Sequence, residues 1–205
     1  MTDKGYTQSI INRTDEAEEG SVFVSSDFAD IANTDTIRRS LNRMTQRGIL
    51  RRVIEGVYEK PKYSQLLDEY VTADPDLVAK AIARNYHWTI APSGLNALNL
   101  LGLSTQVPSV WTYVSDGPYR NFRWGNTQLK FKTRTNKEIT GLSYTTTLVV
   151  QALKTLGKEG VTPEIVQRLR SRLSKSDKKV LLEEASESTD WVYDLIRQVC
   201  ESDNK

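Results

Sequence analysis

Residues 35–58 read DTIRRSLNRMTQRGILRRVIEGVY and predict a helix that runs into a β-hairpin. Ile37, Leu41 and Met44 recur at the i, i+4, i+7 spacing of a single apolar helical stripe. Gly48 should end the helix, because glycine readily adopts the left-handed backbone that helix ends often need. The polar side chains between the apolar positions should therefore point away from the core.

The hairpin follows directly, since two β-type runs, 49–54 and 57–58, flank the turn dipeptide Glu55-Gly56. Positive charge is concentrated over the helix and the hairpin. Residues 38–62 carry eight basic side chains against two acidic ones, on a chain whose net charge is only +2. The basic residues are Arg38, Arg39, Arg43, Arg47, Arg51, Arg52, Lys60 and Lys62. Such a local excess predicts a surface for a phosphate backbone.

The segment before this stretch predicts a first helix over 6–17, a strand over 21–24 and a second helix over 27–32 that Ser25 or Ser26 caps. Helix, strand, helix, turn, helix and hairpin is the order of a winged helix-turn-helix, which we assign to residues 1–63. An exposed arginine face alone is typical of a solvated helix. The tight turn at 33–35 and the second Arg-Arg pair on the following strand favour DNA binding over that alternative.

The rest of the chain, 64–205, predicts a mixed α/β region over 64–140 and a helical part over 141–205. The expected elements of the mixed region are a linker helix near 66–71, a helix over 76–84, a strand over 87–90, a helix over 93–102, and strands over 111–115, 122–124 and 128–133. Apolar stripes from Tyr144 onward predict successive helices. The expected fold class is therefore α+β, with an N-terminal winged helix-turn-helix, a mixed α/β region and a helical C-terminal part.

The composition argues against several kinds of site. Cys200 is the single cysteine and His87 the single histidine, so we expect no intramolecular disulfide and no metal site. No glycine-rich phosphate loop is present, and we expect no cofactor. The chain has no apolar run long enough for a signal peptide core or a membrane span, so a cytoplasmic protein is the expectation.

A catalytic role for the middle region is the weakest alternative. His87, Ser93 and Asp116 could be combined into a triad, but their spacing does not identify one. A lone histidine beside Trp88 is more typical of a structural position. We therefore expect that the chain is not an enzyme and has no catalytic residues.

The chain resembles the AbiEi-type antitoxins of bacterial type IV toxin–antitoxin systems. Two stretches carry the resemblance: 36–58, and 92–108 followed by Tyr113 and Asp116-Gly117-Pro118. The resemblance implies an N-terminal domain that binds operator DNA and represses its own operon. It also implies a C-terminal region that antagonises a nucleotidyltransferase-like toxin. Type IV systems need not form a stable toxin–antitoxin complex.

On this interpretation the helix 35–47 enters the major groove of double-stranded DNA. Thr36, Arg39 and Arg43 should lie nearest the base edges, where arginine can bond bidentately to guanine. Asn42 should read adenine or bond a phosphate. The remaining predicted DNA-binding residues are Thr34 at the helix start and the phosphate contacts Arg38, Arg51, Arg52 and Lys60. Two copies on an inverted-repeat operator are expected, because one small domain rarely gives operator-level specificity.

Two other functions fit the same residues. The basic face could dock an acidic protein partner, which would make the chain a protein-interaction module. Alternatively, the chain could be a transcriptional regulator that has no toxin partner. A steep salt dependence of binding to duplex DNA separates the first alternative from the DNA-binding hypothesis, since neutralising phosphates releases counterions.

Overall fold

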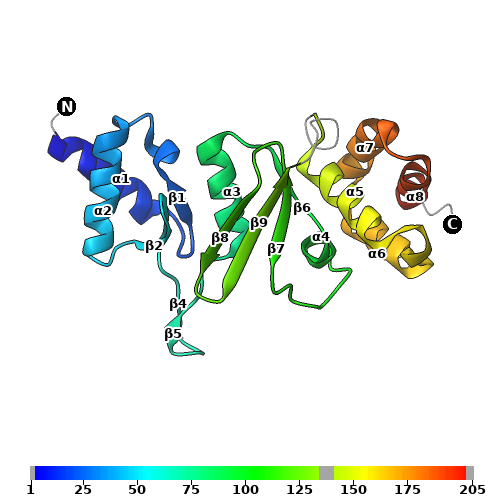
Figure 1. The fold of residues 1–205 in the computed structure, drawn as a ribbon, viewed down its shortest axis with the longest axis horizontal. Coiled ribbons are helices and arrows are strands. Elements are labelled where there is room, and N and C mark those ends of the chain that lie inside the picture. The colour runs from blue at the N-terminus through cyan, green and yellow to red at the C-terminus, as the bar shows by residue number, and fades with distance from the viewer. Residues whose placement is uncertain (1–2, 134–140, 202–205) are drawn as a thin grey trace. The chain divides into compact units, whose positions relative to one another are not determined.

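The computed structural model describes residues 3–133 and 141–201 and has a mixed α+β fold with helices at its C-terminus (Figure 1). Contacts divide the chain into two compact units. The N-terminal unit consists of Met1–Trp88 with Phe122–Thr127, and the C-terminal unit of Thr89–Asn121 with Gln128–Lys205. The N-terminal unit thus extends beyond residue 63, where the sequence predicts a domain boundary. That residues 1–63 act as a DNA-binding domain stays a prediction.

Two helices, α1 (Asp3–Glu16) and α2 (Thr34–Gln46), pack side by side in the N-terminal unit (Figure 1). Between them come β1 (Val22–Val24) and a single 3-10 turn, η1 (Ser25–Phe28). The expected helix over 27–32 with a serine cap is therefore wrong. The carboxylate of Asp27 instead accepts a hydrogen bond from the Val24 N–H at 2.9 Å, and such a local side-chain bond stabilises a tight turn in place of a helix.

A three-stranded antiparallel sheet of order β1-β3-β2 completes this core, with β2 (Arg51–Ile54) and β3 (Val57–Glu59) forming the expected hairpin. Phe23 lies opposite Tyr58, and the β2–β3 register shifts between Arg52 and Ile54. One apolar cluster joins the sheet to the helices. Its buried members are Ile10, Phe23, Phe28, Ile37, Leu41, Met44, Leu50 and Tyr58.

A two-stranded hairpin, β4 (Tyr63–Ser64) and β5 (Glu69–Tyr70), stands where the sequence predicts a linker helix. The Tyr63 and Tyr70 rings meet edge to face, with centroids 5.2 Å apart. Leu66, at the turn, is 93% exposed. A short helix gains most of its stability by burying an apolar face, and no such burial occurs here, so the linker-helix prediction is wrong.

Helix α3 (Pro75–Tyr86) begins as expected, with the Asp74 side chain accepting hydrogen bonds from the Asp76 and Leu77 N–H groups. Its buried face includes Val78, Ala81 and Ile82, whereas Leu77 is 42% exposed. The helix ends at His87, whose backbone is left-handed with φ 56°. His87 therefore caps a helix, and the strand predicted over 87–90 begins only at Ile90.

A four-stranded mixed sheet of order β6-β7-β9-β8 follows. Its strands are β6 (Ile90–Pro92), β7 (Trp111–Ser115), β8 (Arg120–Trp124) and β9 (Thr127–Thr133). β7 runs antiparallel to β6 and parallel to β9, where Tyr113 lies opposite Phe131. The short helix α4 (Leu95–Leu100) contacts β7, and a turn at Gly125-Asn126 joins β8 to β9, whose strands the sequence predicts over 122–124 and 128–133.

The expected helical C-terminal part is confirmed (Figure 1). Its elements are α5 (Tyr144–Leu156), the 3-10 turn η3 (Lys158–Gly160), α6 (Pro163–Arg172), α7 (Lys175–Glu184), the 3-10 turn η4 (Ala185–Glu187) and α8 (Asp190–Cys200). Leu153, Leu169 and Ile196 are fully buried in their shared core. In the described ranges we find no helix whose length and apolar character would let it cross a membrane.

Candidate nucleic-acid interface

Helix α2 forms because its sequence supplies both a buried stripe and a cap. Ile37, Leu41 and Met44 are each at most 1% exposed, as their spacing predicts. The Asn33 side chain accepts a hydrogen bond from the Thr36 N–H at 3.0 Å, which satisfies a donor at the helix start. Gly48, with φ +74°, ends the helix in the expected left-handed conformation. The face opposite the stripe is left to solvent.

Five arginines lie exposed on α2, the turn after it and β2: Arg38, Arg39, Arg43, Arg47 and Arg52. Within residues 3–133 and 141–201, none of these five makes an ion pair or a side-chain hydrogen bond. Their charge is not compensated by the described part of the protein. We call these five residues the open arginines.

Arg51 differs from the open arginines, although it is adjacent to Arg52 in the sequence. Its guanidinium donates to a Glu59 carboxylate oxygen at 2.5 Å and to the Val71 carbonyl at 2.6 Å. Burial raises the pKa of the Glu59 carboxyl, and the Arg51 guanidinium opposes that shift. The charge of Arg51 is thus used inside the protein, where it keeps a buried carboxylate partnered.

Lys60 is also engaged internally. Its Nζ donates to the Asp15 carbonyl at 2.9 Å and to the Ala17 carbonyl at 2.8 Å, at the end of α1. A lysine commonly satisfies the last carbonyls of a helix in this way. Of the residues that the sequence assigns to phosphate, the structure therefore leaves Arg38 and Arg52 open and gives Arg51 and Lys60 structural contacts.

A polar groove of about 890 Å³ lies beside α2. Arg38 and Asn42 of α2 line it, together with Arg52 and Glu55 of the β2–β3 hairpin. Thr34, at the start of α2, also lines the groove and is exposed, whereas Thr36 is half-buried and is not part of the lining. Arg39 and Arg43 are exposed on α2 outside the groove. The predicted DNA-binding residues thus divide into those that line the groove, such as Arg38 and Arg52, and those on the face of α2 outside it, Arg39 and Arg43.

Asn42 has a fixed orientation in this groove, because its Oδ1 accepts a hydrogen bond from the Tyr58 hydroxyl at 3.2 Å. Tyr58 is buried, so the bond ties the amide to the core. The two N–H groups of the Asn42 amide make no hydrogen bond within the described residues. Such donors suit an acceptor such as a phosphate oxygen or the major-groove edge of guanine.

Sequence reasoning gave no DNA-binding role to two further elements of the groove, η1 and the end of α3. Ser25 and Ser26 of η1 line it, as do Asn85 and Tyr86 at the end of α3. Ser25 and Ser26 lie shortly before α2 in the chain, whereas Asn85 and Tyr86 lie far after it and outside the predicted domain 1–63. The only local sequence signal for such a role was the aromatic Tyr86 at the end of α3. An aromatic residue at a helix end is not specific for nucleic-acid binding.

The three residues considered for a triad have structural contacts. His87 caps α3, the Ser93 hydroxyl donates to the Thr112 carbonyl at 3.4 Å, and the Asp116 carboxylate accepts from the Thr89 N–H at 2.9 Å.

Burial raises the pKa of the Cys200 thiol, which contacts the Lys178 carbonyl. Among the described residues, no group of three or more His, Cys, Asp or Glu side chains is arranged to hold a metal ion.

In a comparison with protein families, residues 9–181 match a family of unknown function (DUF6088). The chain belongs to DUF6088. The matched range of this DUF6088 chain includes α2, the β2–β3 hairpin and all the groove residues. No curated protein matches the chain.

Proposed function

We propose that this chain binds duplex DNA through α2 and the β2–β3 hairpin, which act together as the recognition helix and wing of a winged helix-turn-helix. The observation that supports the proposal is the set of open arginines, whose charge has no partner in the described structure. An α-helix fits the major groove of B-DNA, and exposed guanidinium groups bind both guanine and phosphate. A protein surface of this kind gains affinity by releasing counterions from DNA.

The proposed roles divide by position. Arg39 and Arg43, on the helix face outside the groove, would read base edges. Arg38 and Arg52 line the groove and would bind phosphates there. Arg51 and Lys60 leave the proposed set, because their nitrogen atoms already bond carboxylate and carbonyl oxygens. Asn42 would donate to a phosphate or to a base edge through its amide N–H groups.

We extend the proposal to a regulator that represses its own operon and antagonises a nucleotidyltransferase-like toxin. The support for this part is the resemblance to AbiEi-type antitoxins over 36–58 and 92–118. Growth of cells that express a neighbouring nucleotidyltransferase gene, with and without this chain, tests the antitoxin role. Rescue that persists in a variant unable to bind DNA would place the antagonism outside the basic surface.

A mobility-shift assay tests DNA binding directly, with the protein's own upstream region compared with a scrambled duplex at low and at physiological salt. We expect preferential binding of the upstream region that persists at physiological salt. Equal binding to both duplexes that fades with salt would leave only a non-specific electrostatic attraction. The protein-docking alternative would then be the better explanation of the basic surface.

A matched pair of variants controls for net charge. Arg38→Gln with Arg39→Gln removes two charges from α2, and Arg168→Gln with Arg197→Gln removes two exposed charges from α6 and α8. The first variant should bind DNA much more weakly, because each of its two arginines is proposed to bond a phosphate or a base. The second should bind like the unmodified chain. Equal reductions in affinity would contradict the assignment of the interface to α2.

A further inference from the structure

The groove beside α2 has a wall that comes from α3. Asn85 and Tyr86, the last two residues of that helix, line the same groove as Arg38, Asn42 and Arg52. Tyr86 is 51% exposed, and its ring stacks on Trp88 with centroids 4.8 Å apart and an interplanar angle of 20°. The stacking thus orients the Tyr86 ring while about half of the residue remains exposed to solvent.

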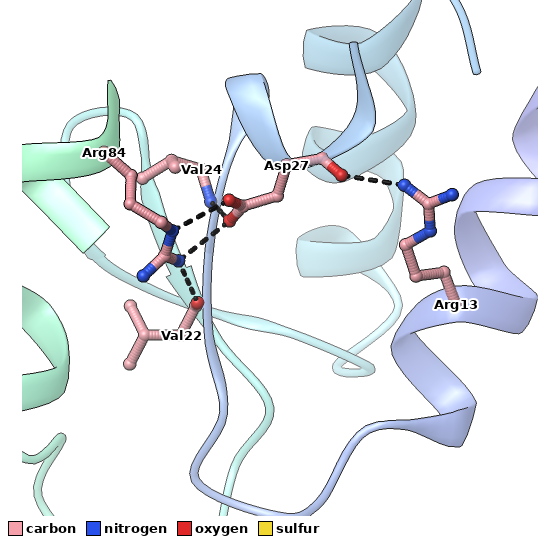
Figure 2. Close-up of polar contacts among 5 residues, drawn as sticks. All are labelled: Arg13, Val22, Val24, Asp27 and Arg84. Carbon is pink, nitrogen blue, oxygen red and sulfur yellow. Dashed lines mark hydrogen bonds and ion pairs between the residues drawn. The ribbon is translucent and has the colours of Figure 1, made fainter. Parts of the chain in front are cut away.

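Arg84 fastens this end of α3 to the turn η1 (Figure 2). Its Nε and Nη2 each donate to one oxygen of the Asp27 carboxylate at 3.0 Å, and Nη2 also donates to the Val22 carbonyl at 3.2 Å. The paired geometry suits a planar guanidinium on a carboxylate. Arg84 directly precedes Asn85, so the ion pair fixes the turn of α3 that lines the groove.

Asp27 is held from a second direction as well (Figure 2). The Arg13 side chain of α1 donates to the Asp27 carbonyl at 2.8 Å and also pairs with the Asp30 carboxylate. One residue of η1 therefore bonds to α1 through its backbone and to α3 through its side chain. Since Ser25 and Ser26 of η1 also line the groove, the network fixes two of its walls together.

The charges of the side chains that line the groove indicate which part of DNA the groove would bind. Its charged side chains are Arg38, Arg52 and Glu55, which leave a net charge of +1. The other polar groups that line it are amides and hydroxyls, from Asn42, Asn85 and Tyr86 among others. Arginine, asparagine and tyrosine side chains are typical donors to phosphate and sugar oxygens. The groove therefore suits a single sugar–phosphate strand.

We propose that the last turn of α3 is part of the DNA-binding surface. The Asn85 amide and the Tyr86 hydroxyl donate to backbone phosphates of the strand that lies in the groove, opposite Arg38 and Arg52. Arg84 is a positioning residue that acts through them. This inference rests on the proposed function and extends the interface beyond the helix and hairpin, to a helix outside residues 1–63.

The test measures the affinity of the full chain for a fluorescein-labelled upstream duplex by anisotropy, over a range of salt concentrations. The variant is Asn85→Ala with Tyr86→Phe, which removes two uncharged donors. Its matched control is Asn121→Ala with Tyr119→Phe, the same chemical change at exposed positions elsewhere. We expect the affinity of the first variant to fall about tenfold with an unchanged salt slope, and the control to stay within about twofold of the unmodified chain.

The outcomes separate the two proposals. If the unmodified chain and the Asn85/Tyr86 variant bind equally while Arg52→Ala binds more weakly, the role of α3 is overturned and the proposed function stands. If the unmodified chain binds no duplex at either end of the salt range, the proposed function fails and this inference fails with it. A reduction in the Asn121/Tyr119 control as large as in the Asn85/Tyr86 variant would also overturn the inference.

Arg84 is tested through its dependence on the other two residues. Arg84→Ala should weaken DNA binding about as much as the Asn85/Tyr86 variant, and Arg84→Lys should restore part of the affinity because it keeps a charge near Asp27. In the background of the Asn85/Tyr86 variant, Arg84→Ala should weaken binding little further, since it acts through the same two side chains. A fully additive effect would contradict the positioning role and would indicate that Arg84 supports the interface through general stability.

Discussion

Arg39 and Arg52 have the same charge, and both are exposed and unpaired within the described structure, but they occupy different positions in the proposed interface. Arg39 lies on the helix face that would enter the major groove of DNA. Arg52 lies on β2 and lines the groove proposed for the phosphate backbone. What each side chain would recognise therefore depends on its surroundings and not on its charge alone.

Arg39→Ala should reduce the preference for the operator over random DNA by ~1–3 kcal/mol for each base that Arg39 recognises. Arg52→Ala should weaken binding to every duplex alike and reduce the salt slope by about one, because it removes a bond to phosphate. Competition binding against operator and random duplexes measures both effects. If each variant showed the same fall in affinity on operator and on random DNA, the division into base-reading and phosphate-binding residues would be wrong.

Glu184 provides a pH-dependent test of stability in the C-terminal unit. Partial burial raises the pKa of its carboxyl, but hydrogen bonds from Thr146 and Ser143 outweigh that effect and hold the pKa below its ordinary value of 4.5. The Ser143 N–H, at the start of α5, donates to Glu184 at 2.8 Å. A lowered folded-state pKa means that the stabilisation is complete above the unfolded pKa and is lost as the pH falls through the folded one.

Glu184→Gln should therefore lower the free energy of unfolding at neutral pH, and the difference from the unmodified chain should shrink as the pH falls through the lowered folded-state pKa. Urea denaturation at several pH values measures this difference. Glu183→Gln, at the exposed neighbouring position, is the control and should have little effect. A difference that grows as the pH falls would contradict the sign of the shift.

At the scale of elements, α2 depends on both of its ends. The Asn33 cap fixes its start, and Gly48 reverses the chain after it into the hairpin. A Cβ at Gly48 would meet no atom within 4 Å, so the position is not crowded. Glycine is needed there only for its left-handed backbone, which an alanine adopts at a cost.

Gly48→Ala should lower the free energy of unfolding by about 1–2 kcal/mol. Gly160→Ala is the matched control, because Gly160 lacks a positive φ and its added Cβ would lie 3.5 Å from Leu156, an ordinary van der Waals separation. That substitution should be close to neutral. If both variants were destabilised equally, the cost at Gly48 could not be assigned to its backbone conformation.

At the scale of the whole molecule, the proposed interface is small for an operator-binding protein. One helix and one hairpin reach a short half-site, and specific recognition of natural operators commonly uses two such units on an inverted repeat. The chain should therefore bind its operator as two copies. This expectation fixes the stoichiometry of the complex at two chains per operator and requires a defined spacing between the two half-sites.

A duplex with the full inverted repeat should bind two chains, and halving the repeat should weaken binding by far more than a factor of two. Sedimentation velocity of the labelled duplex with increasing protein measures the stoichiometry. Changing the spacing between half-sites by half a helical turn should be as harmful as removing one half-site. One chain bound per full repeat, with equal affinity for the half-site, would show that a single copy recognises the operator.

Local sequence signals were sufficient for several elements. The stripe of Ile37, Leu41 and Met44 and the turn at Glu55-Gly56 predicted α2 and its hairpin, and the later stripes predicted the C-terminal helices. Each of these signals depends on residues that are close in the chain: an apolar period, a cap or a tight turn. The sequence by itself therefore determined the helix and hairpin that display the arginines, together with the class of the fold.

Only the tertiary structure decided which basic residues remain available. The sequence alone does not distinguish Arg51 and Lys60 from Arg52. In the structure, however, Arg51 donates hydrogen bonds to Glu59 and Val71, and Lys60 donates to carbonyls at the end of α1. In the same way, η1 and the β4–β5 hairpin replaced predicted helices, and the end of α3 became a wall of the groove. The bonds from Arg51 to Val71 and from Lys60 to the end of α1 depend on partners that lie far away in the chain, whereas η1 and the β4–β5 hairpin are closed by near neighbours, such as Val24 and Asp27 at η1. A local pattern can state what a side chain is able to bind, whereas packing decides whether another part of the protein already binds it.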